Sequence, residues 1–449
     1  MVAAMLNGHS DTIATLVEPG RVHRRVYADP DVFELEMERI FGRAWLFVGH
    51  TSQVPQPGDY FTTELGRQPV VMTRHRDGAV HVLFNRCTHR GAKVANERCG
   101  HAARLTCLYH GWSFDTDGTL AAVPMPEGCA EGFRREAFGL ARVPRVAEYR
   151  GFVFASLAAS GASFEDHIGP IKSNIDDLVD RAPDGALAFD LGVHRYAYDG
   201  NWKLQVENVL DSYHVPFGHA STVNKEGVQF ARREGDKAGT QVIDKATDQV
   251  ADKAAETDKS RTSQSWKGRR SYIVGNGHGW TSNTSLDDGK RSSPAFDEYK
   301  RVLIDKVGAE RAQHILTPRL HNTLIYPNVS IMGLNIHVRV IKPVAFDRTE
   351  INVYPVRLVG APDAMNFGNI RLLNVTHSAA SFVQTDDIEA FVRTQKGLRS
   401  LAGEWVDISR GLGVEEPDRE LNATRASAMH EMAMRAQYKA WLGYMREAA

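Results

Sequence analysis

CTHRGA at residues 87–92 and CLYHGW at residues 107–112 are the two stretches that decide the fold of this chain. They carry two cysteines and two histidines, Cys87, His89, Cys107 and His110, in the spacing C-x-H and C-x-x-H. This ligand set suits a cluster of two irons and two sulfides, with the cysteines on one iron and the histidines on the other. Neutral imidazoles make the outer iron easier to reduce than thiolates would, which places the potential at roughly −150 to +300 mV. The pattern therefore predicts an electron relay.

A structural zinc site is the competing interpretation of the same four residues, because zinc also accepts two cysteines and two histidines. Zinc spacings usually place the pairs as C-x-x-C and H-x-x-x-H, and these four residues do not have that order. The other two cysteines, Cys99 and Cys129, are expected to be ordinary buried thiols rather than extra ligands. Four cysteines in a chain of 449 residues exclude a disulfide scaffold.

The composition narrows the expected partners to small molecules and other proteins. With 449 residues, of which 42% are apolar, the chain can bury a large core and form two or three domains. The 54 Lys and Arg balance the 55 Asp and Glu, and no basic tract with interleaved aromatics occurs, so neither nucleic acid nor a membrane is expected as a partner. No apolar run is long enough to cross a bilayer, and residues 1–20 do not resemble a signal peptide, so we expect a cytoplasmic protein.

Residues 45–157 have the sequence pattern of a small all-β domain. Short alternating or apolar runs at 45–48, 70–73, 80–84 and 151–156 are separated by Pro-Gly and Asp-Gly turns, and both metal-binding stretches fall among these turns. The preceding segment, 1–44, includes an amphipathic helix that starts after Asp29-Pro30 and ends before Gly42.

Residues 158–449 mix helices and strands and are expected to form a larger domain. Residues 335–342 and 350–357 have the pattern of sheet strands, and a long final helix is predicted from Pro417 to Tyr444. Residues 225–300 are polar and charged, which predicts an excursion over the surface, either a lid or a solvated insertion without a catalytic role. The glycines within 275–279 are followed by no helix, so no nucleotide site is expected.

A second metal site is predicted around His214 and His219. Five residues turn a regular helix by roughly 140°, so an undistorted helix would not aim both imidazoles at one ion. Pro216 is expected to kink or end the helix and so let them converge. Two imidazoles and one carboxylate form a facial triad that leaves positions open on a ferrous ion. Two satisfied core histidines are the alternative. Asp211, three residues before His214, is placed to hold the imidazole N–H.

The stretches C-T-H-R-G and C-x-Y-H-G-W resemble the Rieske centres of aromatic-ring-hydroxylating oxygenases. Respiratory Rieske proteins carry an extra cysteine beside each ligand pair, where this chain has Ala92 and Tyr109. Residues 201–219, N-W-K-L-x-x-E-N-x-x-D-x-Y-H-x4-H, resemble the mononuclear-iron motif of the same family. That resemblance implies that His214 and His219 bind the catalytic iron.

The same resemblance implies roles for residues around these histidines. In the family, the aspartate that corresponds to Asp211 bridges toward a Rieske histidine of a neighbouring subunit and forms the electron path. Asn208 and Tyr213 are candidates to support this network, with ordinary packing as the alternative for each.

Residues 385–398 resemble the family's D-D-x-E-x-F…Q-x-G block, which implies that the third iron ligand is Asp387 rather than Asp386. These adjacent carboxylates could also cap the helix that follows.

By this resemblance the chain is the catalytic α subunit of a Rieske non-haem iron oxygenase. The implied fold is α+β, with a β-rich Rieske [2Fe-2S] domain (45–157) inserted into a larger catalytic domain (1–44 and 158–449) whose central antiparallel sheet is flanked by helices. The implied cofactors are one [2Fe-2S] cluster and one mononuclear Fe(II). The implied partners are O2, an aromatic substrate, a separate NAD(P)H-dependent reductase with or without a ferredoxin, and further subunits in an α3 or α3β3 oligomer.

The D-D-x-E-x-F block and the short N-x-x-D interval are similar to those of benzoate-, anthranilate- and salicylate-type enzymes, which implies cis-dihydroxylation of an aromatic acid or amine. Arg339 lies in a strand that resembles the Ile-x-Val-Arg-x-x-x-Pro of this branch, and it could pair with a substrate carboxylate or form a structural salt bridge. A ring monooxygenase or an O- or N-dealkylase on the same metals is the alternative within the enzyme class. Outside that class, the alternative is an electron carrier or a zinc-stabilised binding protein.

Overall fold

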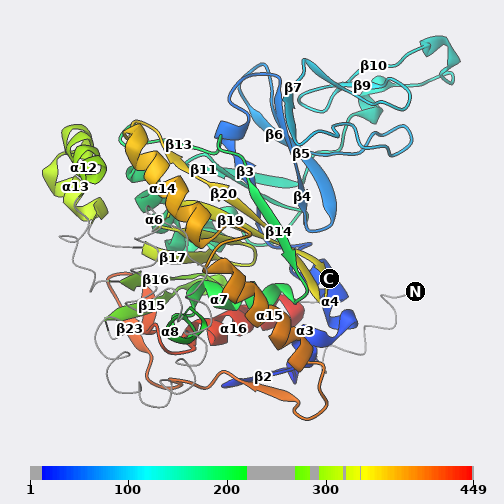
Figure 1. The fold of residues 1–449 in the computed structure, drawn as a ribbon. Coiled ribbons are helices and arrows are strands. Elements are labelled where there is room, and N and C mark those ends of the chain that lie inside the picture. Colours follow the sequence, from blue (N-terminus) through cyan, green and yellow to red (C-terminus); the bar gives the residue numbers. More distant parts are fainter. Residues whose placement is uncertain (1–12, 220–267, 284–292, 317–319, 334, 447–449) are drawn as a thin grey trace, which may run out of the picture.

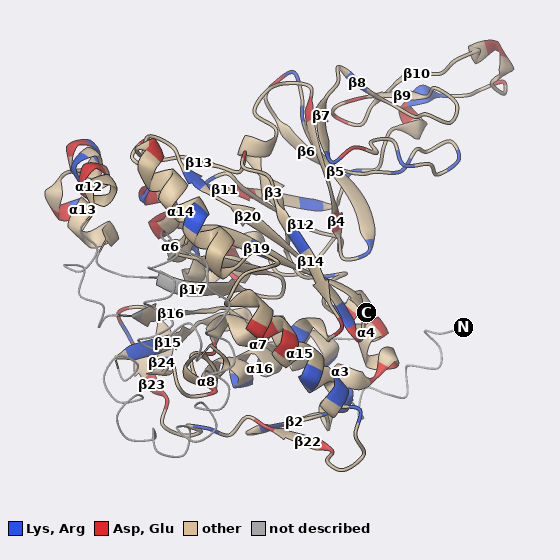
Figure 2. Cartoon of the chain, viewed as in Figure 1, with Lys and Arg blue, Asp and Glu red and all other residues tan. Residues whose placement is uncertain are grey.

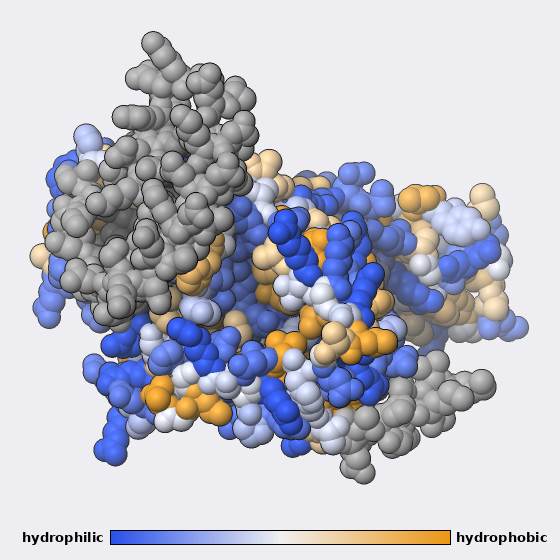
Figure 3. All heavy atoms as spheres, turned by 60° about the horizontal axis from the view of Figure 1, so that its bottom comes forward, coloured by the Kyte–Doolittle hydropathy of each residue, from blue (hydrophilic) through white to orange (hydrophobic). Residues whose placement is uncertain are grey.

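The computed structural model describes residues 13–219, 268–283, 293–316, 320–333 and 335–446 (Figure 1). A β-rich part, drawn in blue and cyan, projects from a larger part in which helices cover a long sheet. Basic and acidic residues are interspersed over both parts (Figure 2). On the face shown in Figure 3, apolar side chains gather in small groups among hydrophilic ones.

The first described helices pack against the C-terminal end of the chain. The strands β1 (Val17–Glu18) and β2 (Arg21–His23) precede the helices α3 (Arg25–Ala28) and α4 (Pro30–Arg39). The start of α4 is as predicted, because the Asp29 carboxylate accepts a hydrogen bond from the N–H of Asp31 and Pro30 occupies the first turn. Helix α4 contacts α16 (Met432–Arg446), and β2 pairs with β22 (Trp405–Asp407).

Residues 46–156 contain three small antiparallel sheets. Their orders are β11-β12-β3, β6-β5-β4-β7 and β10-β9-β8. The strands are β3 (Leu46–His50), β4 (Asp59–Leu65), β5 (Gln68–Arg74), β6 (Val80–Phe84), β7 (Cys99–His101), β8 (Arg104–Thr106), β9 (Ser113–Asp115), β10 (Leu120–Ala122), β11 (Arg145–Tyr149) and β12 (Phe152–Ser156). Short 3-10 helices lie at η1 (Thr51–Gln53), η2 (Pro126–Gly128) and η3 (Arg135–Phe138). The four runs predicted as strands are confirmed as β3, β5, β6 and β12.

Strands β5 and β6 have two buried faces, because their alternate residues join different cores. Val70, Met72 and Val82 belong to the large core that continues into the rest of the molecule. Val71 and Leu83 belong to a smaller core that also contains both cysteines of the predicted relay. Both ligand loops therefore pack on this small core. Cys129 is partly buried against it, whereas the prediction that Cys99 is buried is wrong, because Cys99 is exposed at the start of β7.

The larger part is built on a nine-stranded antiparallel sheet of order β14-β20-β19-β18-β17-β16-β15-β24-β23. Its strands are β14 (His194–Tyr198), β15 (Arg269–Ile273), β16 (Gly279–Asn283), β17 (Leu320–Ile325), β18 (Val329–Met332), β19 (His337–Ala345), β20 (Arg348–Pro355), β23 (Glu416–Asp418) and β24 (Ala423–Ser427). A two-stranded pair joins β13 (Leu187–Ala188) to β21 (Arg357–Leu358). The predicted strands at 335–342 and 350–357 are confirmed by β19 and β20.

The helices lie around this sheet. They are α5 (Phe164–Ile168), α6 (Lys172–Asp180), α7 (Trp202–Leu210), α8 (Val215–Gly218), α12 (Pro294–Val307), α13 (Ala309–Leu316), α14 (Asp363–Thr376) and α15 (Gln384–Gly397), with 3-10 turns at η4 (Gly169–Ile171) and η5 (Gly275–Gly277). Helix α7 contacts β16, β17 and β19, and α15 contacts β14 and α8. The α+β class, with an antiparallel sheet flanked by helices, is confirmed, whereas the domain boundaries stay a prediction.

Two predictions about the larger part are wrong. The final helix does not start at Pro417, which lies in β23, and it begins only at Met432. Strand β23 is the last of the sheet, and a proline is tolerated at such an edge because its missing N–H is not needed by a further strand.

The predicted surface insertion at 225–300 is wrong for residues 268–283, which form two inner strands, β15 and β16, with Ser271 and Thr281 buried. The remainder of that range up to 292, including any lid, lies outside the described residues.

Candidate metal centres

The two loops that carry the predicted relay ligands have the same backbone design. In each, the cysteine N–H donates to the carbonyl five residues later, and the glycine N–H four residues later donates back to the cysteine carbonyl. The bonds measure 2.8 and 2.9 Å in both loops, from Cys87 to Ala92 and Gly91, and from Cys107 to Trp112 and Gly111. Both glycines have a positive φ, 79° and 71°, which a side chain would disfavour. CTHRGA and CLYHGW are therefore two copies of one tight loop.

The four candidate ligands of these loops are divided between the inside and the outside of the β-rich part. Cys87 and Cys107 are 1% and 2% exposed and belong to the same small core. Burial raises the pKa of the Cys87 thiol, while the backbone N–H groups of His89 and Arg90 point at its sulfur and act against that rise. The rings of His89 and His110 lie at the surface with centroids 4.6 Å apart. Two sulfurs inside and two imidazoles outside match a cluster with differently ligated irons.

This division argues against a single zinc ion. Tetrahedral zinc binds its ligands at about 2.0–2.3 Å, so four ligand atoms would crowd within about 4 Å of one another. Among the described residues, the only group of three or more His, Cys, Asp or Glu ligand atoms within 4.8 Å of one another is His214, His219 and Asp387. The four side chains of the relay loops therefore do not close around one point.

The segment with the two predicted iron histidines is not one kinked helix. Helix α7 is capped by the Asn201 side chain, which accepts from the N–H of Lys203, and it ends at Leu210. The backbone at Asp211 is extended, and its carboxylate accepts from the N–H of Tyr213 at 2.6 Å. The separate short helix α8 then begins after His214 and ends before His219.

The prediction that Pro216 ends the helix is therefore wrong. The break occurs at Asp211, whose side chain competes for the backbone as aspartate does in turns. Pro216 lies in the first turn of α8, where a proline favours the start of a helix.

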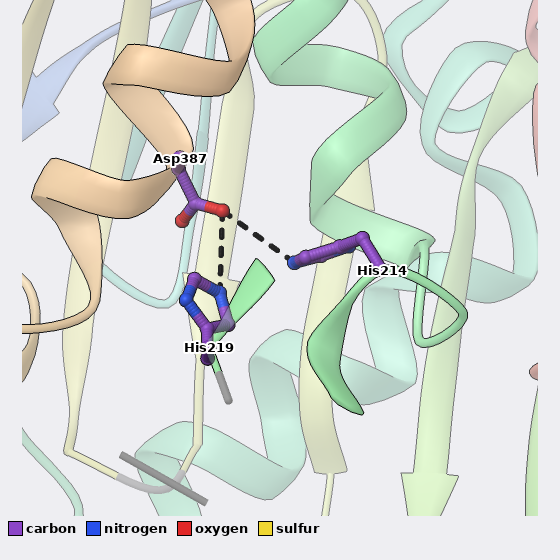
Figure 4. Close-up of side chains that lie close together, drawn as sticks. All are labelled: His214, His219 and Asp387. Atoms are coloured by element: carbon purple, nitrogen blue, oxygen red, sulfur yellow. Dashed lines mark ion pairs between the residues drawn. The ribbon is translucent and has the colours of Figure 1, made fainter. Parts of the chain in front are cut away.

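His214, His219 and Asp387 converge at the junction of α7, α8 and α15 (Figure 4). Oδ1 of Asp387 lies 3.2 Å from Nε2 of His219 and 3.5 Å from Nε2 of His214. Asp387 comes from the first turn of α15. His219 and Asp387 are buried, whereas the His214 side chain is 25% exposed. A group of this composition, with one open side, can hold a ferrous ion by one face.

A carboxylate lies near Nδ1 of each imidazole, the ring nitrogen that does not face Asp387. Nδ1 of His219 is hydrogen-bonded to Oδ2 of Asp386 at 3.3 Å, whereas Nδ1 of His214 lies 3.1 Å from Oδ2 of Asp211 without the geometry of a hydrogen bond. Burial lowers the pKa of His219, but the hydrogen bond to Asp387 and the charges of both carboxylates outweigh it and raise the pKa overall. A carboxylate behind a histidine turns the Nε2 lone pair toward the metal side.

Asn208 connects α7 to this group. Its Nδ2 donates to Oδ1 of Asp387 at 3.0 Å and lies 3.3 Å from Nε2 of His214. Its Oδ1 accepts from Nε2 of Gln205 at 3.2 Å, which fixes the orientation of the Asn208 amide. Gln205 is fully buried, and it was not predicted because it occupies a position of the motif with no family residue assigned.

Tyr213 and Arg339 do not join the three converging residues. The Tyr213 ring packs against Phe217, with centroids 5.8 Å apart, and the Arg410 guanidinium lies 4.0 Å from its centre. Arg339 is buried on β19, where it donates to Oε1 of Gln384 at 2.9 Å. Gln384 begins α15, three residues before Asp387, so Arg339 lies near the site without touching it.

A buried charged network, which was not predicted, connects α7 to α4 and α16. Lys203 and Glu36 form an ion pair of 2.5 Å with side chains 4% and 0% exposed. The indole N–H groups of Trp202 and Trp441 donate to the same carboxylate at 2.8 and 2.7 Å. The alternation of Lys203, Gln205 and Glu207 with the apolar Trp202, Leu204 and Val206 is the sequence signal that could have revealed it.

The two candidate centres lie far apart within one chain. The relay loops are at the tip of the β-rich part, near β9, whereas α7, α8 and α15 are in the body of the larger part (Figure 1). Among the helices of the described residues, none has the length and apolar character that crossing a membrane requires.

Comparison with known proteins places the chain in a family. A Rieske [2Fe-2S] domain model matches residues 44–144, and the catalytic-domain model of ring-hydroxylating alpha subunits matches residues 189–447. The chain is 32% identical to the 2-halobenzoate 1,2-dioxygenase large subunit of Burkholderia cepacia, over 87% of this chain and 80% of that protein. It is 33% identical to the anthranilate 1,2-dioxygenase large subunit of Acinetobacter baylyi, again over 87% and 80%.

A solved structure shares the fold. Naphthalene 1,2-dioxygenase with indole in its active site superposes with a TM-score of 0.80 at 23% identity, over 96% of this chain and 94% of that one. The family models and the benzoate-like relatives show that the chain belongs to the ring-hydroxylating alpha subunits and is a Rieske non-haem iron dioxygenase of that family.

Proposed function

We propose that this subunit hydroxylates the ring of an aromatic acid or amine with O2, through one [2Fe-2S] cluster and one mononuclear Fe(II). Cys87, Cys107, His89 and His110 would hold the cluster. His214, His219 and Asp387 would hold the mononuclear iron, and their convergence is the observation that carries the proposal. When bound, the cluster supplies single electrons, and the ferrous ion supplies open positions for O2 beside the substrate.

The residues around the iron site position its ligands. Asn208 holds the Asp387 carboxylate in place, and Gln205 holds the Asn208 amide. Asp386 orients the His219 imidazole through a hydrogen bond, and the Asp211 carboxylate lies 3.1 Å from Nδ1 of His214. Because Asp211 faces His214 and also follows the end of α7, it is the residue we propose as the link for electrons that reach this site.

The relatives support the proposed substrate class, since their names include 2-halobenzoate and anthranilate. We propose cis-dihydroxylation, in which both hydroxyl groups are added to adjacent ring carbons. A ring monooxygenase would add a single oxygen atom to the substrate, so the products distinguish the two reactions.

Electrons are proposed to come from a separate NAD(P)H-dependent reductase, with or without a ferredoxin, and to enter an α3 or α3β3 oligomer. The distance between the two centres in one chain supports an oligomer. So does the exposure of Leu108 and Tyr109, at 81% and 53%, in the loop that carries His110. A cytoplasmic location stays a prediction.

The test is turnover of the purified, iron-loaded protein with a surrogate reductase, NADH and O2. Benzoate, anthranilate, salicylate, aniline and naphthalene are compared by product analysis. We expect a dihydrodiol, or the catechol formed from it, from at least one acid or amine, and none with a His219→Ala variant. Incorporation of a single oxygen atom would select the monooxygenase, and a loaded protein that oxidises no aromatic compound would refute the proposal.

A further inference from the structure

Among the described residues, a buried guanidinium on β19 has no anionic partner. Arg339 is 4% exposed, and the hydrogen bond that it donates to Oε1 of Gln384 is to a neutral group. Its Nε is buried without a hydrogen-bond partner, and within the described part of the chain no carboxylate forms an ion pair with it. A buried charge without a partner is costly, so such a side chain is expected to meet an anion in the working protein. The structural salt bridge considered for Arg339 is thus not found among these residues.

Two further buried polar groups lie on the same side of the sheet. The Tyr196 hydroxyl and Nε2 of Gln384 are both buried, and neither has a hydrogen-bond partner in the part of the chain that the structure describes. Arg339 is opposite Val353 of β20, and Tyr196 is opposite Ile351 two residues away on that strand, so both side chains project from one face. Helix α15 covers this face, since Arg339 bonds to Gln384 and α15 contacts β14.

All three unsatisfied groups can donate a hydrogen bond. The Nε of Arg339 and the amide Nε2 of Gln384 only donate, and the Tyr196 hydroxyl can donate. The complementary ligand is therefore a group that only accepts and carries a negative charge, which describes a carboxylate. His337, two residues before Arg339, adds no charge to this cluster, because burial lowers its pKa to about 3 and keeps its ring neutral.

This cluster is next to the iron site. Gln384 and Asp387 are three residues apart in the first turn of α15, so their side chains lie on one side of the helix. Burial raises the pKa of Tyr196 to about 12, and the charges of Arg339 and Asp387 act on it in opposite directions. The Tyr196 hydroxyl is thus within electrostatic reach of both the guanidinium and the iron-site carboxylate.

We propose that Arg339, Tyr196 and Gln384 form an anion site that binds the carboxylate of an aromatic acid and so places its ring beside His214, His219 and Asp387. The inference rests on the proposed function and narrows it, because an aromatic amine has no anion to offer this site. Arg339 is then a specificity-determining residue.

The test measures binding rather than turnover. The metal-loaded oxygenase is titrated with benzoate and with its uncharged analogue benzamide by calorimetry, in the wild type and in Arg339→Met. We expect the dissociation constant for benzoate to rise roughly 10- to 100-fold, as for loss of a charged hydrogen-bonding group, and that for benzamide to change less than about threefold. Arg393→Gln is the matched control, since Arg393 is an exposed arginine of α15 paired with Glu389, and it should leave both constants unchanged.

The ligand-free stability gives an independent readout. Removing an unpaired buried charge should leave the melting temperature of Arg339→Met at or above that of the wild type. A lower melting temperature together with unchanged benzoate binding would mark Arg339 as structural and overturn the proposal. If Arg339→Met does not fold, Tyr196→Phe replaces it and should weaken benzoate binding by about threefold to tenfold. Unchanged binding in Tyr196→Phe would then overturn the proposal.

The failure of this inference is distinguishable from the failure of the proposed function. If the wild-type enzyme hydroxylates aniline or naphthalene but does not bind benzoate, the oxygenase function is supported and the anion site is refuted. If the protein contains no mononuclear iron but still binds benzoate through Arg339, the oxygenase function is refuted and the anion site is supported.

Discussion

The substitution Asn208→Ala tests how the iron site is held together. The Asn208 amide donates to Oδ1 of Asp387 at 3.0 Å, and that carboxylate oxygen also lies nearest both imidazoles. Alanine removes this donor and leaves the carboxylate free to rotate away from the histidines. Because the other ligands remain, iron should still bind, but more weakly.

The expected size of the effect follows from the kind of bond that is lost. A hydrogen bond to a charged group contributes about 1.5–3 kcal/mol, which corresponds to roughly 10- to 150-fold in affinity. Partners that orient metal ligands in other proteins affect metal affinity by about 10- to 100-fold. We therefore expect the dissociation constant for Fe(II) to rise about 10- to 100-fold.

The assay is anaerobic competition for Fe(II) between the protein and a chelator, with the visible absorbance of the cluster as a check on folding. Asn174→Ala is the matched control, because it removes a buried amide that donates to Oγ1 of Thr323 at 2.8 Å, elsewhere in the same part of the molecule. The control should leave the iron affinity unchanged. An affinity within about threefold of the wild type for Asn208→Ala would refute the positioning role.

Three further substitutions test other parts of the account. Asp211→Asn should keep both metals but largely abolish turnover with reductant, since its carboxylate lies 3.1 Å from Nδ1 of His214, and near-normal coupled activity would refute that role. Glu36→Gln should lower the free energy of unfolding in urea by about 3–5 kcal/mol, because it leaves the buried Lys203 without its charge partner. Adding Lys203→Met should restore most of this free energy. A loss under about 1 kcal/mol in Glu36→Gln would contradict the role of the ion pair. Glu207→Gln should flatten the pH dependence of stability. Burial raises the pKa of Glu207 to about 7, so the folded protein keeps a proton that the unfolded chain loses above about pH 4.5. The free energy of unfolding of the wild type should therefore fall by about 3 kcal/mol between about pH 4.5 and pH 7 because of this group. Parallel stability curves for Glu207→Gln and the wild type between pH 5 and 8 would count against this assignment.

The local features of the fold could be predicted because their causes are local. The ligand loops follow from the spacing of cysteine, histidine and glycine, and the glycine conformations close each loop in the same way. The start of α4 follows from Asp29 and Pro30 alone. The convergence of His214 and His219 was expected from sequence, although its cause is the aspartate turn at residue 211 rather than Pro216.

The features that were missed depend on contacts between distant segments. Residues 268–283 look polar, but Ser271 and Thr281 are buried because other strands of the sheet flank β15 and β16 on both sides. Likewise, the predicted final helix starts at Pro417, but Pro417 and the residues up to Ser427 belong to the edge of that sheet, with β23 and β24. The local sequence of a strand does not indicate that its partner strand lies more than 100 residues away.

The buried partners of Lys203 and Arg339 could not be predicted from the sequence either. Lys203 and Glu36 are separated by 167 positions, and Arg339 and Gln384 by 45. A motif identifies residues that the family shares, but the partner of a buried charge is determined by the packing of helices on the sheet.

The most direct test of the central claim is the content of iron, acid-labile sulfide and zinc in the purified chain and in His214→Ala. We expect roughly three irons and two sulfides per chain in the wild type, and roughly two irons with unchanged sulfide and visible absorbance in the variant. Zinc without sulfide in the wild type, or loss of the cluster instead of the single iron in His214→Ala, would contradict the account.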